Sequence, residues 1–365
     1  MSHLQLLRGN KEYMHDLIDG ELAYAKDTNE LFIGRDGENV LVNGNIGQNL
    51  LINGNFDFWQ RGISHTAYGV GSADRWTVGT VNGVTVMAER GTLAADELQG
   101  STFFMRINVQ AFSGATNNST PFFQRLERHI VETLAGKVVT LSFYAKADAE
   151  RDFSLRFSNS WSSAMTTNFI TKGRFTTEWK KYEFTGVFPR PSTNVMQSSP
   201  QGSTIIALVW SEDDIASGLA IAPPVRQTGV FDFAQMKLEI GDKATPFIPP
   251  DLTEELIRCQ RFYEKSYDLD VVPGTGSVDS IGFRRSVAYA HNRMQGFTYQ
   301  RKRIIPKITL YAPDTGTIGG AFGFPSLNLG VSTVGTSGVS QITSNADALV
   351  VNNSYAYHFI ADAEM

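Results

Sequence analysis

The chain has 365 residues, of which 42% are hydrophobic, 19% charged and 11% aromatic, and its formal net charge is −5. This balance is typical of a globular protein with a β-rich core, and the acidic excess argues against nucleic-acid binding. The single cysteine, Cys259, excludes intrachain disulfides and cysteine-based metal cages. No apolar run approaches the ~20 residues that a membrane helix needs, so we expect no membrane insertion.

The length predicts two or three domains. The first residues, Met1 to Gln5, lack the basic and apolar segments of a signal peptide, so we expect a product that is assembled in the cytoplasm.

Residues 1–47 form a module of their own. Leu22 and Tyr24, then Leu31 and Ile33, alternate with polar residues on either side of a short polar link, which predicts a β-hairpin. A segment this short buries little apolar area alone, so we expect it to oligomerise. A hairpin pair on a monomer is the alternative.

A short buried strand is predicted next, from Leu50 to Ile52. Asn53-Gly54 follows it and predicts a turn with positive φ. We interpret this stretch as the first strand of a sandwich domain spanning residues 48–250.

The rest of residues 48–250 alternates in period two between turns, which favours a two-sheet sandwich. A helix or helical turn is predicted only between Phe122 and Leu134. The predicted strands are 103–109, 137–146, 153–157, 179–188, 205–210 and 230–239.

Residues 251–365 form the third unit. Pro246, Pro249 and Pro250 break regular structure before it, and Asp251 or Thr253 can cap a helix that runs to Phe262. Strands are predicted at 281–283, 308–311 and 355–361, and display loops at 316–326 and 330–344. The fold class expected is all-β: a small N-terminal β-hairpin attachment module, a jelly-roll β-sandwich and a C-terminal β-rich tip domain joined by a linker helix.

Several of these segments resemble parts of phage tail fibres. Residues 19–37 look like the N-terminal domain of phage receptor-binding fibres, the major tropism determinant among them. Residues 49–62, with Ala73-Asp74-Arg75-Trp76, resemble the opening of jelly-roll domains in phage tail-fibre proteins, which are similar to carbohydrate-binding modules. Residues 246–263 and 306–313 resemble the junction and the recurrent strand of fibre tip domains. The resemblance implies a homotrimer in the virion, contacts with other virion proteins through the N-terminal module, and a host cell-surface glycan as ligand.

Exposed aromatic and basic side chains are the candidates for glycan binding. Sugar rings stack on exposed tryptophans, and Trp161 in a polar loop and Trp179 beside a strand are the candidates, whereas apolar contexts place Trp59, Trp76 and Trp210 in the core. Arg301, Lys302 and Arg303 are the basic candidates for an anionic surface glycan. A solvated face or intersubunit salt bridges are the alternative for these three cations.

Asn55, Asp57 and Asp232 are the matching positions for a structural calcium ion that related sandwich modules often hold. Turn residues that bind their own backbone are the plainer reading of the same positions. No other cofactor is expected.

Catalysis is not expected. The strand carboxylates Glu178, Glu183, Asp232 and Glu239 would form a hydrolase pair only if two of them faced one cleft at a suitable separation, and the sequence has no Gly-x-Ser-x-Gly, His-Glu-x-x-His or P-loop motif. The sequence therefore predicts a non-catalytic, trimeric phage tail fibre that adheres to host surface glycans. A capsid decoration protein or head fibre is the alternative, and a glycan depolymerase is the third.

Overall fold

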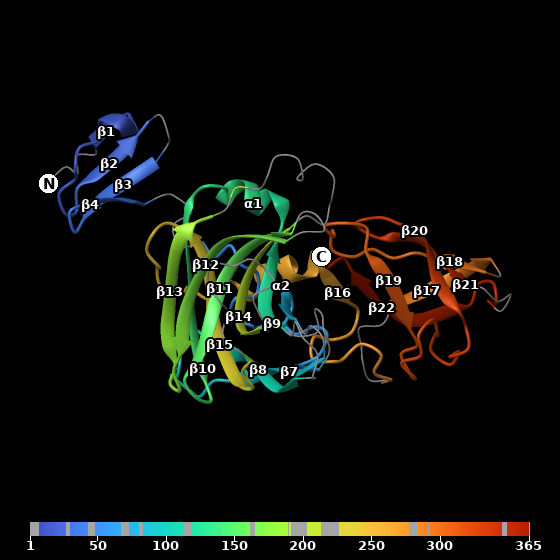
Figure 1. Ribbon diagram of the computed structural model, residues 1–365. Helices are drawn as coiled ribbons and strands as arrows, with labels where there is room; N and C mark the ends of the chain where they lie inside the picture. The colour runs from blue at the N-terminus through green and yellow to red at the C-terminus, as the bar shows by residue number, and fades with distance from the viewer. Residues whose placement is uncertain are drawn as a thin grey trace.

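The computed structural model describes residues 7–26, 30–42, 48–66, 73–79, 83–112, 119–160, 165–188, 190, 203–212, 226–276, 284–290, 292–344 and 349–364. The described elements are almost all strands, apart from one 3-10 helix and two short α-helices, so the all-β expectation is confirmed. The strands form three groups (Figure 1), and each described strand pairs within its own group. No described helix is long and apolar enough to cross a membrane.

The N-terminal group is a four-stranded sheet in the order β1-β2-β3-β4. Leu22 pairs with Ile33, which confirms the predicted hairpin, and β1 adds in parallel to β2. Its small core contains Leu17 and Phe32, and the side chain of Tyr13 is 78% exposed. The elements are β1 (Leu7–Gly9), η1 (Lys11–Tyr13), β2 (Leu22–Ala25), β3 (Glu30–Arg35) and β4 (Glu38–Leu41).

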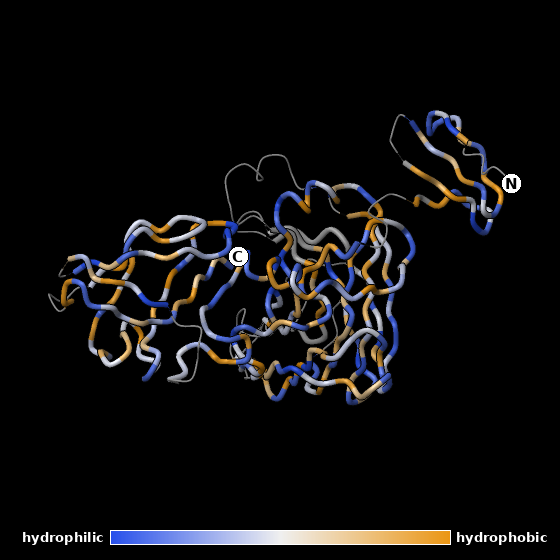
Figure 2. The backbone as a smooth tube through the Cα atoms, turned by 180° about the vertical axis from the view of Figure 1, so that it is seen from behind, coloured by the Kyte–Doolittle hydropathy of each residue, from blue (hydrophilic) through white to orange (hydrophobic). Residues whose placement is uncertain are grey.

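The middle group is a sandwich of a six-stranded sheet, β13-β10-β15-β8-β7-β5, and a five-stranded sheet, β12-β11-β14-β9-β6. Its strands are β5 (Ser64–His65), β6 (Trp76–Val78), β7 (Val84–Thr92), β8 (Phe103–Phe112), β9 (Ser119–Leu126), β10 (Val138–Ala147), β11 (Arg151–Ser160), β12 (Met165–Phe175), β13 (Lys180–Val187), β14 (Ser203–Glu212) and β15 (Gly229–Ile240). Hydrophobic and hydrophilic residues alternate along these strands (Figure 2), so each sheet has one face for the core and one for its surroundings.

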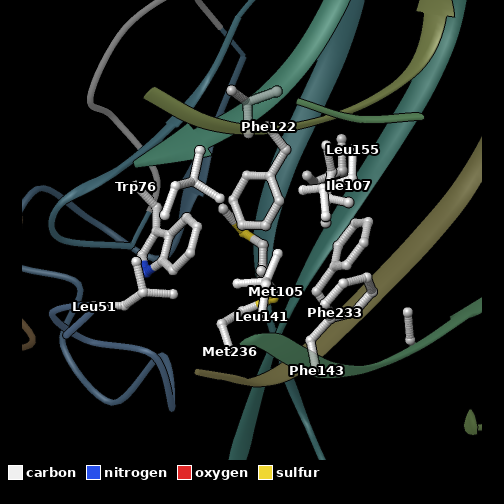
Figure 3. Packing of buried hydrophobic residues seen from close by; sticks show 14 of the residues in the cluster. Leu51, Trp76, Met105, Ile107, Phe122, Leu141, Phe143, Leu155, Phe233 and Met236 are labelled. Carbon is white, nitrogen blue, oxygen red and sulfur yellow. The ribbon is translucent and has the colours of Figure 1, made fainter. Parts of the chain in front are cut away.

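The core between the two sheets combines aromatic and aliphatic side chains (Figure 3). Trp76 stacks on Phe122 with ring centroids 4.8 Å apart, and Phe122 lies 5.1 Å from Phe233 of the other sheet. Trp59 and Trp76 are buried, as predicted, whereas the side chain of Trp210 on β14 lies outside the described ones.

The predicted strand from Leu50 to Ile52 is wrong, because this segment forms bends and turns. Only the N–H of Leu50 bonds a strand, at the carbonyl of Leu238, whereas side chains satisfy the backbone of the next two residues: Gln124 bonds both the N–H and the C=O of Ile52. The turn itself is confirmed, with Asn53 at φ 56°. The helix foreseen between Phe122 and Leu134 is shorter than that range, since β9 runs to Leu126 and α1 spans Arg128–Leu134.

The C-terminal group begins with helix α2 (Leu252–Gln260), whose first N–H groups donate to the capping carboxylate of Asp251. The predicted strands at 308–311 and 355–361 are confirmed as β19 and β22, and the one at 281–283 lies outside the described residues. The predicted display loop at 330–344 is wrong: it is a hairpin of β20 and β21, in which Val331 pairs with Ile342. The strands are β16 (Tyr263–Lys265), β17 (Arg284–Ala290), β18 (Arg293–Gln295), β19 (Lys307–Tyr311), β20 (Leu329–Val334), β21 (Val339–Ser344) and β22 (Ser354–Asp362).

Candidate functional site

The outer face of the six-stranded sheet carries a band of charged side chains. On β10 the residues Val139, Leu141, Phe143 and Ala145 point into the core, so Tyr144 and Lys146 point outward. The strand register places Lys146 beside Asp232, Asp232 beside Arg106, and Arg106 beside Glu89. Positive and negative groups therefore alternate across four neighbouring strands.

A bidentate ion pair lies at the centre of this band. The guanidinium of Arg106 donates from Nε and Nη2 to the two carboxylate oxygens of Asp232, at 2.8 and 2.9 Å. This hydrogen-bonded pair raises the pKa of Arg106 despite its partial burial. The carboxylate of Asp232 is buried, whereas 38% of the Arg106 side chain stays exposed. Planar, partly exposed guanidinium groups of this kind can donate to sugar hydroxyls.

Trp179 lies at the end of the band, just before β13. Its indole N–H donates to Glu97 at 2.7 Å, Lys146 lies 4.8 Å from its ring centroid, and the edge of Phe104 meets it at 5.5 Å. The pKa of Glu97 is lowered, chiefly because the backbone N–H of Ala94 donates to its carboxylate. The half-buried indole is thus held in one orientation while part of its surface remains open.

A cleft of about 300 Å³ adjoins this aromatic end of the face. Tyr144 on β10, Leu98 on the turn before β8 and Phe247 line it, the last on the segment that follows β15 (residues 241–250), which we call the connector. The cleft mixes apolar walls with amide, hydroxyl and ammonium groups, as sugar-sized ligands require. Its other lining residues are Gln99, Ser142, Phe143, Lys181, Gln235 and Pro246.

A buried ion pair fastens the connector to the sheet. Lys237 and Glu239, both 1% exposed, lie 3.3 Å apart on the outer side of β15. Thr245 receives a hydrogen bond from Lys237 at 2.5 Å and donates to Glu239 at 2.6 Å, and Lys237 also donates to the Pro246 carbonyl. The cleft wall at Pro246 and Phe247 is therefore part of the sandwich.

Those predicted glycan-binding residues that the structure describes do not come together at one surface. Trp179 lies at the cleft end of the band, and Trp161 lies outside the described residues. Arg301 is exposed in the C-terminal unit, whereas Lys302 is buried and pairs with Glu264 at 2.5 Å.

Arg303 lies between the sandwich and the C-terminal unit. It donates to the carbonyl of Ala363 at 3.4 Å and lies 4.0 Å from Glu127. Its charge and that of Lys302 are thus already engaged within the protein, and the glycan role of the three cations stays a prediction.

The predicted calcium ligands are divided in the same way. The side-chain amide of Asn55 donates to Asp57 at 3.2 Å, while Asp232 is held by Arg106. Ser101 donates to Asn55 as well. Over the described part of the chain, no group of three or more His, Cys, Asp or Glu side chains is arranged to hold a metal ion. The calcium hypothesis stays a prediction that would need oxygen ligands from the backbone and amides.

Tyr144, Lys146, Glu97 and the connector are parts of the face that the sequence reasoning missed. The alternation of β10 was recognised, and it marks Tyr144 as an outward aromatic residue on a strand. No short stretch of sequence indicates that the turn before β8 and the connector pack on the same sheet, because that packing depends on the order of the strands.

Comparison with known proteins gives only distant likenesses. No protein-family model matches the chain, and no curated protein matches it. Among solved structures, one described as CBM4 has 16% identity and a TM-score of 0.33 over 52% of this chain and 98% of its own. The enzymatically active domain of tailspike protein 4 from bacteriophage CBA120 has 13% identity and a TM-score of 0.31 over 53% of this chain and 21% of its own. A family 11 carbohydrate-binding module from Clostridium thermocellum, in complex with a β-1,3-1,4-mixed-linked tetrasaccharide, has 11% identity and a TM-score of 0.29 over 50% and 99%. Likenesses this distant do not assign a function.

Proposed function

We propose that this protein is a non-catalytic bacteriophage virion protein, a trimeric tail fibre that adheres to host surface glycans, and that the outer face of its six-stranded sheet binds the sugar. The observation that carries the binding proposal is the fixed indole of Trp179, which packs against the same cluster as the cleft residues Leu98 and Tyr144. The C–H face of a sugar ring stacks on such a ring, and the neighbouring amides, hydroxyls and cations supply partners for its hydroxyls.

The carboxylates on this face support binding without catalysis. A glycosidase needs an acid and a second carboxylate that both face the scissile bond. Asp232 is instead held by both donor atoms of Arg106, and Glu239 is buried against Lys237 and Thr245. Glu183 pairs with Lys181 at 2.5 Å at the edge strand. Each of these carboxylates already has a cation as partner.

The virion role rests on the sequence resemblance of residues 19–37, and of residues 49–62 with 73–76, to phage fibre proteins. A small sheet with a four-residue core and an exposed Tyr13 gains stability by packing on other copies. Two other readings keep the same sandwich: a capsid decoration protein or head fibre, which should bind empty heads that lack tails, and a glycan depolymerase, which should release reducing ends from host polysaccharide.

The test is binding of the purified full-length protein to host and non-host cells, with its oligomeric mass measured by light scattering. We expect a trimer that binds host cells, and we expect Trp179→Ala to weaken that binding by roughly tenfold, the value of one stacked aromatic contact. Val187→Ala is the matched control, because Val187 is a 59% exposed residue near the other end of the adjoining strand. Equal binding by both variants would remove the sugar site from this face. A trimer that ignores cells and binds capsids would favour the decoration protein.

A further inference from the structure

The C-terminal unit has a second sheet face with its own chemistry. On β17 the side chains of Ser286 and Ala288 are buried, so Arg285, Val287 and Tyr289 point outward. On β18 the buried Met294 leaves Arg293 and Gln295 on the same outer side. The four strands β17, β18, β21 and β20 lie side by side at the end of the molecule away from the N-terminal sheet (Figure 1).

The register continues this face with neutral polar groups. Gln295 pairs with Gln341, which pairs with Ser332, and Arg293 pairs with Thr343. Met294 and Ile342 alternate with these residues and belong to the buried core of the unit. The outer face of β17, β18, β21 and β20, which we call the distal face, therefore carries arginines, amides and hydroxyls together with a tyrosine on β17.

The charged residues within the four described strands are all positive. The four strands contain three arginines and no Asp or Glu. Over residues 284–344 the sequence has seven Lys and Arg residues and a single acid, Asp314, although the whole chain has a net charge of −5. Local positive charge within an acidic protein is a feature of anion recognition.

Two larger side chains are exposed on the distal face. Tyr289 is 50% exposed and Val287 is 49% exposed on the same strand. A tyrosine offers both a ring face for a sugar and a hydroxyl for a hydrogen bond, and it loses little entropy on binding.

We propose that the distal face binds an acidic polysaccharide whose sugars carry carboxylates. The guanidinium forks of Arg285 and Arg293 match carboxylate geometry, Tyr289 takes the sugar ring, and Gln295 and Gln341 take hydroxyls. A face with two outward arginines fits a polymer with one charge per sugar better than nucleic acid, which carries a charge every ~1.7 Å. This ligand chemistry and this surface differ from those of the sandwich face.

The experiment measures binding of the full-length protein to polygalacturonate, with neutral dextran as the uncharged polymer. We expect binding to polygalacturonate that weakens with salt, and a loss of roughly tenfold in the Arg285→Gln/Arg293→Gln variant. Arg128→Gln/Arg174→Gln is the matched control: it removes the same charge from exposed arginines of the sandwich and should bind as the wild type does. Thermal unfolding of each variant shows whether its fold is intact.

Trp179→Ala separates this proposal from the sandwich site, because it should leave polygalacturonate binding unchanged. An equal loss in the control variant would mean that binding follows net charge, and would overturn the proposal. So would absence of polygalacturonate binding, tighter binding of a phosphorylated mannan, or equal binding of single-stranded DNA through the same arginines. Tyr289→Ala should weaken binding to the same degree at low and high salt.

Discussion

The guanidinium of Arg75 lies 3.4 Å from the centroid of the Phe262 ring, and this contact joins the sandwich to the C-terminal unit. Arg61 lies in the same way over Tyr263, at 3.6 Å. Glu364, near the end of the last strand, forms an ion pair with Arg75. The two units are therefore held together by arginines that stack on aromatic rings, and a carboxylate of the C-terminal segment compensates their charge.

Arg75→Ala should uncouple the two units. Arg75 is 3% exposed, so its removal leaves Glu364 as a buried carboxylate without this partner, a change that costs about 3–5 kcal/mol. Urea unfolding can be monitored by fluorescence and circular dichroism. We expect the wild type to unfold in one transition for both units and the variant to unfold in two. Arg174→Ala, which breaks an exposed pair with Asp152, is the control and should change little. A single unshifted transition in Arg75→Ala would contradict the coupling.

Acid should weaken the same junction through Glu127. Burial alone would raise the pKa of this carboxyl, but the hydrogen bonds from Arg261, at 2.9 and 3.1 Å, outweigh burial and lower it. Because the pKa of Glu127 is lower in the folded protein than in the unfolded chain, where it is about 4.5, its stabilisation is complete at a pH above the unfolded-state pKa. The stabilisation is lost as the pH falls through the folded-state pKa.

Thermal unfolding of the wild type and of Glu127→Gln from pH 7 to pH 3 tests this dependence. The wild type should be the more stable protein at pH 7, and the difference should shrink below pH about 4.5. A difference that stays constant over this range would show that the ionised carboxylate contributes nothing.

Asp57 should have the opposite pH dependence. Burial raises its pKa to about 6, and the hydrogen bond from Asn55 only partly offsets that effect. The folded protein then binds a proton more tightly than the unfolded chain, so this group favours folding progressively as the pH falls from about 6 towards 4. Asp57→Asn should raise the melting temperature at pH 8 and have little effect at pH 4.5. Asp152→Asn, at an exposed carboxylate, is the control. An equal effect of Asp57→Asn at both pH values would contradict the raised pKa.

Strand periodicity accounts for the part of the fold that the sequence predicts. Phe153, Leu155 and Phe157 alternate strictly with polar residues, and all three are buried in β11. Large apolar residues in period two determine which face of a strand is buried, wherever its partners come from in the sequence. The hairpin of β20 and β21 was missed because its sequence is rich in Gly, Ser and Thr, and only its pairing places Val339 and Ile342 in a core.

The strand predicted at Leu50–Ile52 does not form because side chains bond the backbone of Leu51 and Ile52, and only the N–H of Leu50 bonds a strand. Asn49 accepts from the N–H of Leu51 and of Leu238 and donates to the carbonyl of Met236, 187 positions away. A sequence window cannot contain that partner. The candidate site has the same limit: Trp179 stands out as a tryptophan beside a strand, but its cleft depends on a turn and a connector that only the folded sheet brings together.

Thr245→Val should both destabilise the sandwich and change its sugar binding. The hydroxyl of Thr245 contacts the buried ion pair of Lys237 and Glu239, and valine keeps its shape while removing both hydrogen bonds. Buried charged groups that lose a partner cost about 1–3 kcal/mol, which urea unfolding can measure. Because Pro246 and Phe247 form one wall of the cleft, a loosened connector should also weaken glycan binding.

Thr253→Val is the control for this change, since Thr253 is exposed on α2 and its side chain is of the same size. It should leave both stability and glycan binding close to the wild-type values. A Thr245→Val protein that loses stability while keeping full glycan affinity would show that the connector supports the fold alone. A proportional loss of stability and of glycan affinity would show that the buried ion pair beneath the connector maintains the shape of the cleft.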